Sequence, residues 1–338
     1  MSFSVKVEPS GHQFTVEADE SILDAALRQG VVLPYGCRSG ACGACVAKVV
    51  EGKVHYPDGN LPPALSEEEA AVGMVALCLA HADSDLVIES KEVESPEAIT
   101  VKTLPCRIEV MERLNEDVML LKLKLPDNER LQFLAGQYIQ ILLKDGRKRS
   151  FSLANAPEKD DLLELHIRHV EGGEFTTEVF DKMKVKDILR IEGPHGQFYL
   201  REDSPRDIIF MAGGTGFAPI KGMIEHAIDI GLERNMTLYW GARDRKHLYL
   251  HDWCEKMAAG HANFTYIPVL SQPLPEDHWT GRTGLVHEAI IEDHPDLSGY
   301  DVYAAGPPAM VEAGKQAFPQ HGLDLAHYYS DAFEFQRK

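Results

Sequence analysis

The sequence predicts three consecutive domains: a small α+β domain, an antiparallel β-barrel, and an α/β domain built on a parallel sheet. Three observations lead to this expectation. Three cysteines crowd between residues 37 and 45, short β-rich runs alternate with polar turns over residues 103–200, and a buried-strand pattern at residues 207–212 runs into a glycine turn and an apolar-periodic helix. The length of 338 residues also favours two or three domains.

The composition excludes several classes of protein. The chain carries 34 Lys and Arg against 53 Asp and Glu, a formal net charge of −19, which disfavours a general nucleic-acid binder and a binder of anionic membrane surfaces. A hydrophobic fraction of 44% supplies packed cores and excludes wholesale disorder. The chain has no apolar run of membrane-spanning length, and its first residues do not resemble a signal peptide. We therefore expect a cytoplasmic protein that acts without nucleic acid or a membrane.

Two polar, proline-containing stretches divide the chain. The first ends at Pro96 and separates an acidic segment, residues 1–95, from a linker at residues 96–102. The second separates a β-rich segment, residues 103–203, from an apolar-patterned segment, residues 204–338. We expect a domain boundary at each stretch.

The first segment has the pattern of a compact α+β unit. Apolar runs at residues 3–7 and 14–16 flank a polar turn and predict a hairpin. Ser21, with Asp24 three residues later, predicts the start of one helix, and Ser66 predicts the start of another.

Four cysteines in this unit have the spacing of metal ligands. The pattern C-x4-C-x2-C with a distant fourth cysteine is that of plant-type [2Fe-2S] ferredoxins. Glycines between the cysteines allow the backbone to curl around an inorganic core. Zinc is the alternative, but zinc sites use two short paired clips instead of one three-cysteine clip. The predicted metal ligands are Cys37, Cys42, Cys45 and Cys78.

With these cysteines, the segment PYGCRSGACGACVAKVVEGKV resembles the cluster loop of the ferredoxin-like [2Fe-2S] family. The resemblance covers about residues 1–95 and implies a β-grasp fold of the plant-type ferredoxin kind and one-electron chemistry. His55 and His81 lie near in the sequence, but a Rieske-type centre would need histidine in place of two cysteines, and four cysteines are present.

The β-rich segment contains three short motifs: GQY at residues 136–138, RSFS at 149–152 and GGEFTT at 172–177. Each is weak alone, and a solvated Lys-Arg turn beside a core strand is the alternative. Their order and spacing resemble the flavin-binding domain of the ferredoxin-NADP reductase superfamily, which implies a barrel that binds flavin. The flavin-binding residues implied are Tyr138, Arg149, Ser150, Phe151, Ser152, Gly172, Gly173, Thr176 and Thr177.

The residue types suit a flavin. Arg149 offers a planar, permanently charged donor to a flavin phosphate. The glycines and threonine hydroxyls can hold the pyrophosphate at the start of a helix. As the family motif implies, Ser152 hydrogen-bonds the reactive edge of the flavin near N5 and is a catalytic candidate. Phe333 is the second catalytic candidate, as an aromatic lid over the flavin; packing in the core is the alternative role for it.

The last segment has the strand, glycine turn and helix of a dinucleotide-binding unit. Glycines at this turn let the backbone approach a pyrophosphate. The turn that ends the third strand of this segment reads Gly-Pro-Pro, where the superfamily usually has Cys-Gly-Pro-Pro, but Ala305 stands in place of the cysteine. The nucleotide-binding candidates are Gly213, Gly214, Thr215, Gly216, Arg243, Gly306 and Pro307.

The nucleotide itself is less sharply predicted. Relatives that prefer NADH often carry an acidic residue for the ribose hydroxyls, whereas this chain has the charged run RDRKH at residues 243–247. Those charges could bind a 2′-phosphate or face water. We expect NAD(P)H, with a slight preference for NADH.

The domain order resembles that of the reductase components of bacterial oxygenases and of CDP-6-deoxy-glucoseen reductase. The resemblance implies hydride transfer from NAD(P)H to FAD, stepwise transfer to a [2Fe-2S] cluster, and delivery to a separate redox acceptor protein such as an oxygenase or dehydratase component. FAD in place of FMN follows from the domain order of these relatives. Two alternatives remain: a flavin or small-molecule reductase with an incidental ferredoxin domain, and a cluster-based sensor.

Overall fold

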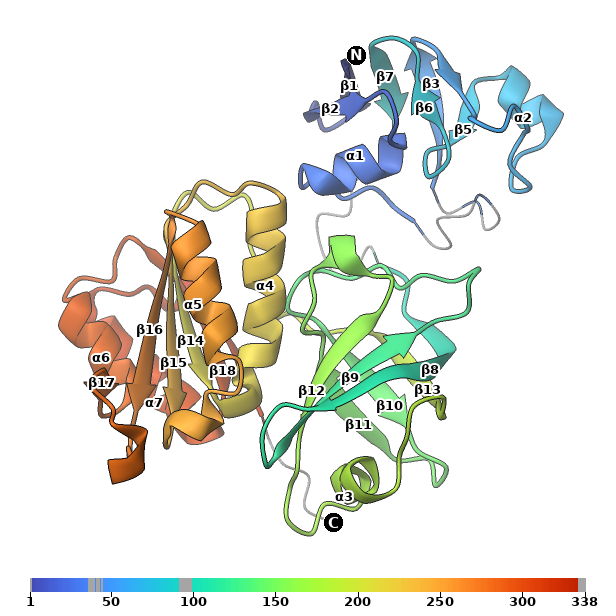
Figure 1. Ribbon diagram of the computed structural model, residues 1–338. Helices are drawn as coiled ribbons and strands as arrows, with labels where there is room; N and C mark the ends of the chain where they lie inside the picture. Colours follow the sequence, from blue (N-terminus) through green and yellow to red (C-terminus); the bar gives the residue numbers. More distant parts are fainter. Residues whose placement is uncertain (1, 36–39, 41–42, 44, 91–98, 334–338) are drawn as a thin grey trace.

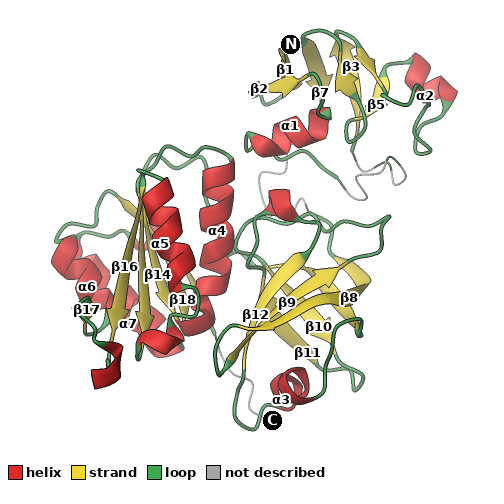
Figure 2. Cartoon of the chain, viewed as in Figure 1, coloured by secondary structure: helices red, strands yellow, loops and turns green. Residues whose placement is uncertain are grey.

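The computed structural model describes residues 2–35, 40, 43, 45–90 and 99–333. Its sheets form three bodies, in the order that the sequence predicts (Figure 1 and Figure 2). The predicted fold class is confirmed: an α+β unit, an antiparallel barrel and a parallel α/β unit follow one another. Within the described part of the chain, no helix is both long and apolar enough to cross a membrane.

The first body is a five-stranded mixed sheet in the order β2-β1-β7-β3-β5, in which β1 and β7 are parallel. Both predicted helix starts are confirmed, because the Ser21 and Ser66 hydroxyls accept hydrogen bonds from the N–H groups of Asp24 and Glu69. The elements are β1 (Ser2–Glu8), β2 (Gln13–Glu17), α1 (Ile22–Arg28), β3 (Val46–Glu51), β4 (Val54–His55), α2 (Glu67–Ala71), β5 (Met74–Ala76), β6 (His81–Ala82) and β7 (Leu86–Glu89).

The second body is a six-stranded antiparallel sheet in the order β11-β10-β13-β8-β9-β12. A bridge between Leu153 and Leu165 joins its two edges, so the sheet curls into a barrel. Lys148 and Arg149, which the alternative interpretation placed in a solvated turn, belong to β11. The elements are β8 (Lys102–Arg113), β9 (Val118–Lys124), β10 (Tyr138–Leu142), β11 (Lys148–Ser152), β12 (Leu163–Arg168), α3 (Glu174–Asp181) and β13 (Ile188–His195).

The third body is a fully parallel sheet in the order β17-β16-β15-β14-β18-β19, with one hydrophobic core on each face. Helices α4 and α5 cover one face, and α6 and α7 the other (Figure 1). The elements are β14 (Asp207–Gly213), α4 (Phe217–Asp229), β15 (Met236–Ala242), α5 (His251–Gly260), β16 (Phe264–Leu270), β17 (Arg282–Thr283), α6 (Val286–Asp293), β18 (Tyr300–Gly306), α7 (Pro308–Ala317) and β19 (Tyr328–Ala332).

Helix α4 belongs to the third body and packs against the barrel (Figure 1). A Cβ at Gly222 would lie 3.1 Å from the Leu153 carbonyl oxygen and 3.0 Å from that of Asn155, so the helix backbone approaches the barrel closely. Near its C-terminal end, buried His226 donates from Nδ1 to Glu158 at 2.9 Å and from Nε2 to Glu202 at 3.0 Å. Burial lowers the pKa of His226, but the two carboxylates outweigh it and raise the pKa to about 10.

This histidine predicts a specific pH dependence of stability. The folded chain keeps the His226 proton between its ordinary pKa of 6.5 and about 10, whereas the unfolded chain loses it. The stabilisation is full below pH 6.5 and is lost as the pH rises toward 10, at up to about 1.4 kcal/mol per pH unit. In thermal unfolding at pH 7 and pH 9, the wild type should therefore lose more stability than His226→Gln. Equal losses in the two proteins would contradict this account.

Candidate active site and cluster site

Cys45 and Cys78, two of the predicted metal ligands, lie close together in the first body. The Leu77 N–H, adjacent to Cys78, donates to the Cys45 carbonyl at 3.2 Å, and both cysteines are buried. Cys37 and Cys42 lie outside the described residues.

Glycine geometry supports a tight loop at this place. Gly40 has a φ of +71°, and a Cβ there would lie 2.5 Å from Leu79 Cδ1 and 3.0 Å from Pro62 Cβ. Only glycine fits this backbone without displacing its neighbours. The two buried thiols, on backbone segments joined by a hydrogen bond, fit half of the four-thiolate donor set of a [2Fe-2S] cluster.

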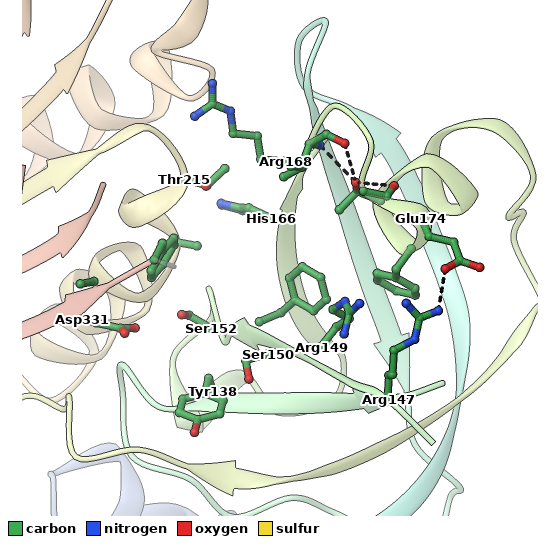
Figure 3. A pocket seen from close by; sticks show the side chains of 18 of the residues that line it. Tyr138, Arg147, Arg149, Ser150, Ser152, His166, Arg168, Glu174, Thr215 and Asp331 are labelled. Atoms are coloured by element: carbon green, nitrogen blue, oxygen red, sulfur yellow. Dashed lines mark hydrogen bonds and ion pairs between the residues drawn. The ribbon is translucent and has the colours of Figure 1, made fainter. Parts of the chain in front are cut away.

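A cavity of about 390 Å³ lies between the barrel and the third body, and we call it the interdomain cavity (Figure 3). Its volume is in the range of cofactor sites. It brings together residues from β10, β11, β12, α3 and its preceding turn, the glycine turn before α4, and the chain after β19. The lining residues are Tyr138, Arg147, Arg149, Ser150, Phe151, Ser152, His166, Arg168, Val170, Gly172, Gly173, Glu174, Phe175, Thr176, Thr215, Ala218, Asp331, Ala332 and Phe333.

Aromatic rings form the apolar wall of the interdomain cavity. The Tyr138 ring lies 5.6 Å from the His195 ring, and the Phe151 ring lies 5.6 Å from the Phe175 ring, measured between centroids. Tyr138 is also held in place by Gly196, where a Cβ would lie 3.0 Å from the tyrosine ring. These contacts give the cavity an aromatic wall against which a flavin ring can pack.

The N-terminus of α3 opens onto the same cavity. Gly173 at the helix start has no side chain to cap the first N–H groups, and Gly172 before it has a φ of +75°. Uncapped N–H groups at a helix start suit a pyrophosphate. Thr176 lines the cavity as predicted, whereas Thr177 lies outside the lining, and its hydroxyl lies 3.4 Å from His169 Nε2.

Arg147 and Arg149, two positions apart in the sequence, have different surroundings. Arg147, which sequence reasoning treated as part of a turn, pairs with Glu174 at the start of α3 at 2.6 Å (Figure 3). Arg149 lines the cavity and donates from Nη1 to the Lys148 carbonyl at 2.9 Å. Arg147 thus fixes α3 to β11, and Arg149 presents its charge to the cavity.

Ser152 lies beside a carboxyl group that sequence reasoning missed. Asp331, near the end of β19, lies close to Ser152 in the interdomain cavity (Figure 3). Burial raises the pKa of Asp331 to about 6, although the hydrogen bond with Ser152 lowers it. Phe333 lines the same cavity, and its N–H donates to the Gly306 carbonyl at 2.8 Å, which ties the chain after β19 to the turn at the end of β18.

A buried charge cluster forms the far wall between the two bodies. His166 donates from Nε2 to Glu164 at 3.0 Å and accepts from the Tyr249 hydroxyl at 3.1 Å. Lys221 on α4 contacts Glu164 at 3.1 Å and donates to the Ala154 carbonyl at 3.0 Å. Burial lowers the pKa of His166, which keeps its ring neutral, while His166 and Lys221 hold the pKa of Glu164 well below its usual range despite burial.

The glycines of the third body pack two turns against each other. A Cβ at Gly216 would lie 2.0 Å from the Ala305 carbonyl oxygen, and one at Gly306 would lie 2.6 Å from the Gly213 carbonyl oxygen. Pro307 and Gly214 belong to the same pair of turns, between β14 and α4 and between β18 and α7. The contact brings Thr215, predicted as a nucleotide residue, into the interdomain cavity.

The charged run after β15 lies at the same carboxyl-terminal edge of the parallel sheet as these two turns. Arg243 follows the last residue of β15, and its carbonyl accepts from the Gln272 N–H at 2.8 Å. Lys246 pairs with Glu116 of the barrel at 2.9 Å, and His247 pairs with Asp244 at 2.6 Å. Lys246 and His247, two of the cationic side chains that could have bound a 2′-phosphate, therefore already pair with carboxylates.

Sequence reasoning missed Asp331, His166 and Arg168 as cavity residues. No motif marks His166 or Arg168, and in the C-terminal segment the prediction chose Phe333 and not Asp331. The partners of Asp331, His166 and Arg168 are distant in sequence: Ser152, Tyr249 and Asp117, respectively. The alternation of side chains along β12 is the one sequence pattern that could have pointed to His166, which faces the cavity.

Three protein-family models match the chain, one for each of its three bodies. Residues 5–83 match the 2Fe-2S iron-sulfur cluster binding domain, residues 105–199 match the oxidoreductase FAD-binding domain, and residues 210–316 match the oxidoreductase NAD-binding domain.

Relatives match along the whole chain. The CDP-6-deoxy-L-threo-D-glycero-4-hexulose-3-dehydrase reductase of Yersinia pestis is 41% identical over 98% of this chain and 99% of its own. The reductase component DmpP of phenol 2-monooxygenase from Pseudomonas sp. strain CF600 is 39% identical over 98% of this chain and 95% of its own. The crystal structure of the Amycolatopsis cytochrome P450 reductase GcoB is similar with a TM-score of 0.65 and 32% identity, over 98% of both chains. The chain therefore belongs to the family of three-domain [2Fe-2S] ferredoxin reductases and is an NAD(P)H-dependent flavin and iron-sulfur oxidoreductase.

Proposed function

We propose that this chain supplies single electrons from NADH to a separate acceptor protein, through FAD in the interdomain cavity and a [2Fe-2S] cluster at Cys37, Cys42, Cys45 and Cys78. The observation that carries the proposal is the interdomain cavity, because one wall holds the flavin motifs and the other holds the glycine turn of the nucleotide domain. The supporting relatives are named as reductases of a deoxysugar dehydrase and of an oxygenase, so we propose an acceptor of one of these two classes.

When bound, FAD takes up two electrons as a hydride and the [2Fe-2S] cluster exchanges them one at a time. The chain's own residues provide the setting. We propose that Tyr138, Phe151 and Phe333 hold the flavin ring and exclude water, and that Arg149 binds a flavin phosphate beside the N-terminus of α3. Thr215 comes from the nucleotide side of the cavity, where it can orient the nicotinamide against the ring.

Ser152 and Asp331 supply a place for a proton. With a pKa of about 6, Asp331 is ionised at neutral pH and accepts a hydrogen bond from the Ser152 Oγ–H. We propose that this pair holds the proton that must leave the reactive edge of the flavin as electrons move on. The pair gives Ser152, a catalytic candidate from the family motif, a defined partner.

The charged run at residues 243–247 supports NADH as the preferred nucleotide. Lys246 and His247 are engaged by Glu116 and Asp244, and the neighbouring surface adds the carboxylates of Glu276 and Asp277. These negative charges disfavour the extra phosphate of NADPH. NAD(P)H is a cytoplasmic reductant and cluster thiols need a reducing compartment, so we also propose a cytoplasmic location.

Loss of one cluster ligand should separate the two halves of the reaction. We expect Cys42→Ser to retain NADH-dependent reduction of ferricyanide, which takes electrons from the flavin, and to lose reduction of cytochrome c, which takes single electrons from the cluster. Cys106→Ala, which removes a buried thiol of the barrel, serves as the matched control and should keep both activities. If Cys42→Ser reduced cytochrome c at the wild-type rate, the protein would act as a plain flavin reductase.

Removal of the Asp331 carboxyl should change the pH profile. Below pH 6, Asp331 is protonated and cannot accept a proton from Ser152, so wild-type turnover with cytochrome c should rise with pH through about 6. Asp331→Asn should lower turnover and remove that inflection, while steady-state rates at pH 5 to 8 provide the measurement. An unchanged inflection in the variant would assign the titration to another group.

Release of Lys246 should improve the use of NADPH. The ion pair with Lys246 lowers the pKa of Glu116, and both side chains are exposed. Glu116→Gln frees the ammonium group for a 2′-phosphate, and we expect kcat/KM for NADPH to rise about two- to threefold, the size of an exposed ion pair. The exposed Glu112→Gln on the same barrel should change neither nucleotide. A rise for NADH equal to that for NADPH would place Lys246 away from the phosphate.

A further inference from the structure

A buried loop connects the three bodies. Residues 131–137, which we call the junction segment, belong to no helix or strand, yet every one of them is buried. Loops normally run over the surface, because their backbone polar groups need partners. A fully buried loop therefore requires specific partners, and the junction segment finds them in all three bodies.

The N-terminal part of the junction segment contacts the first body through the side chain of Gln132. Gln132 is 9% exposed, and its Nε2 donates to the Leu33 carbonyl at 3.0 Å while its Oε1 accepts from the Tyr35 N–H at 3.2 Å. We call these two hydrogen bonds of Gln132 the clasp. Next to it, Leu134 packs in a small apolar cluster with Val32 of the first body. Leu33 and Tyr35 directly precede the cysteine loop, so the clasp holds the chain just before Cys37.

Its C-terminal part is fixed to the barrel and to α4. Gln137 accepts from the Leu134 N–H at 2.8 Å and donates to the Gly196 carbonyl at 3.0 Å. A Cβ at Gly136, whose φ is +107°, would lie 2.2 Å from Met223 Cε on α4. The next residue, Tyr138, lines the interdomain cavity. Five buried residues, 133–137, thus separate Gln132, which bonds the chain before Cys37, from Tyr138 in the cavity wall.

We propose that Gln132 is a positioning residue for electron transfer, which sets the distance between the cysteine loop and the flavin cavity. The step moves one electron from reduced flavin to oxidised cluster and breaks no bond, so its rate depends on how close the two sites are held. An amide suits the task because it offers one donor and one acceptor to the backbone on either side of Pro34. The inference rests on the proposed order of electron flow.

The test compares full-length proteins loaded with FAD and cluster. Gln132→Met keeps the side-chain length and removes both hydrogen bonds, and Gln132→Glu keeps only the acceptor. Asn263→Leu is the matched control, because it removes two side-chain hydrogen bonds to backbone carbonyls that stay inside the third body. Two quantities are measured: hydrogen exchange in peptides covering residues 31–35, and the ratio of cytochrome c reduction to ferricyanide reduction. Absorbance and EPR of the cluster verify equal loading.

We expect Gln132→Met to speed amide exchange at Tyr35 about tenfold, the effect of one lost buried hydrogen bond, and to lower the activity ratio at least about threefold. Gln132→Glu should lie between it and the wild type, and Asn263→Leu should leave the ratio unchanged. Unchanged exchange, faster exchange with an unchanged ratio, or an equal effect of Asn263→Leu would each overturn the proposal. A wild type that reduced ferricyanide but not cytochrome c would instead contradict the proposed function.

Discussion

The buried ion cluster around Lys221 is the interaction on which the arrangement depends. Its ammonium group, almost removed from water, is held by the Glu164 carboxylate and the Ala154 carbonyl of the barrel. A buried charge is costly unless it is paired and hydrogen-bonded, so this contact tolerates few alternative positions of α4. Because α4 begins at the glycine turn of the nucleotide domain, the contact also fixes Thr215 beside the flavin motifs of the barrel.

The second requirement of the chemistry is a fixed relation between the flavin cavity and the cysteine loop. The first body meets the rest of the chain through few described contacts: the clasp of Gln132, the apolar cluster that joins Val32 to Leu134, and the approach of Gly30 to Glu202. Small contact areas of this kind normally permit domain motion. Buried, directional hydrogen bonds therefore carry more of the positioning here than apolar area does.

The sequence predicted features that are local in the chain. The cysteine spacing, the caps at Ser21 and Ser66 and the strand–glycine–helix pattern each depend on residues within a few positions of one another, and the three-domain fold follows from them. The partners of Ser152 and Lys246 could not be predicted, because Asp331 and Glu116 meet them only through tertiary packing. Thr177 continues the motif but is not among the residues that line the cavity, and its hydroxyl lies beside His169.

The central claim is that electrons pass from the flavin cavity to the cysteine loop within one chain. The most direct measurement is an anaerobic stopped-flow reaction of the loaded protein with NADH, followed at flavin and iron-sulfur wavelengths and repeated with NADPH. The account predicts that flavin absorbance bleaches first, that cluster absorbance follows in a slower phase, and that NADH acts faster than NADPH. Bleaching of the flavin with a fully loaded cluster left oxidised would contradict it.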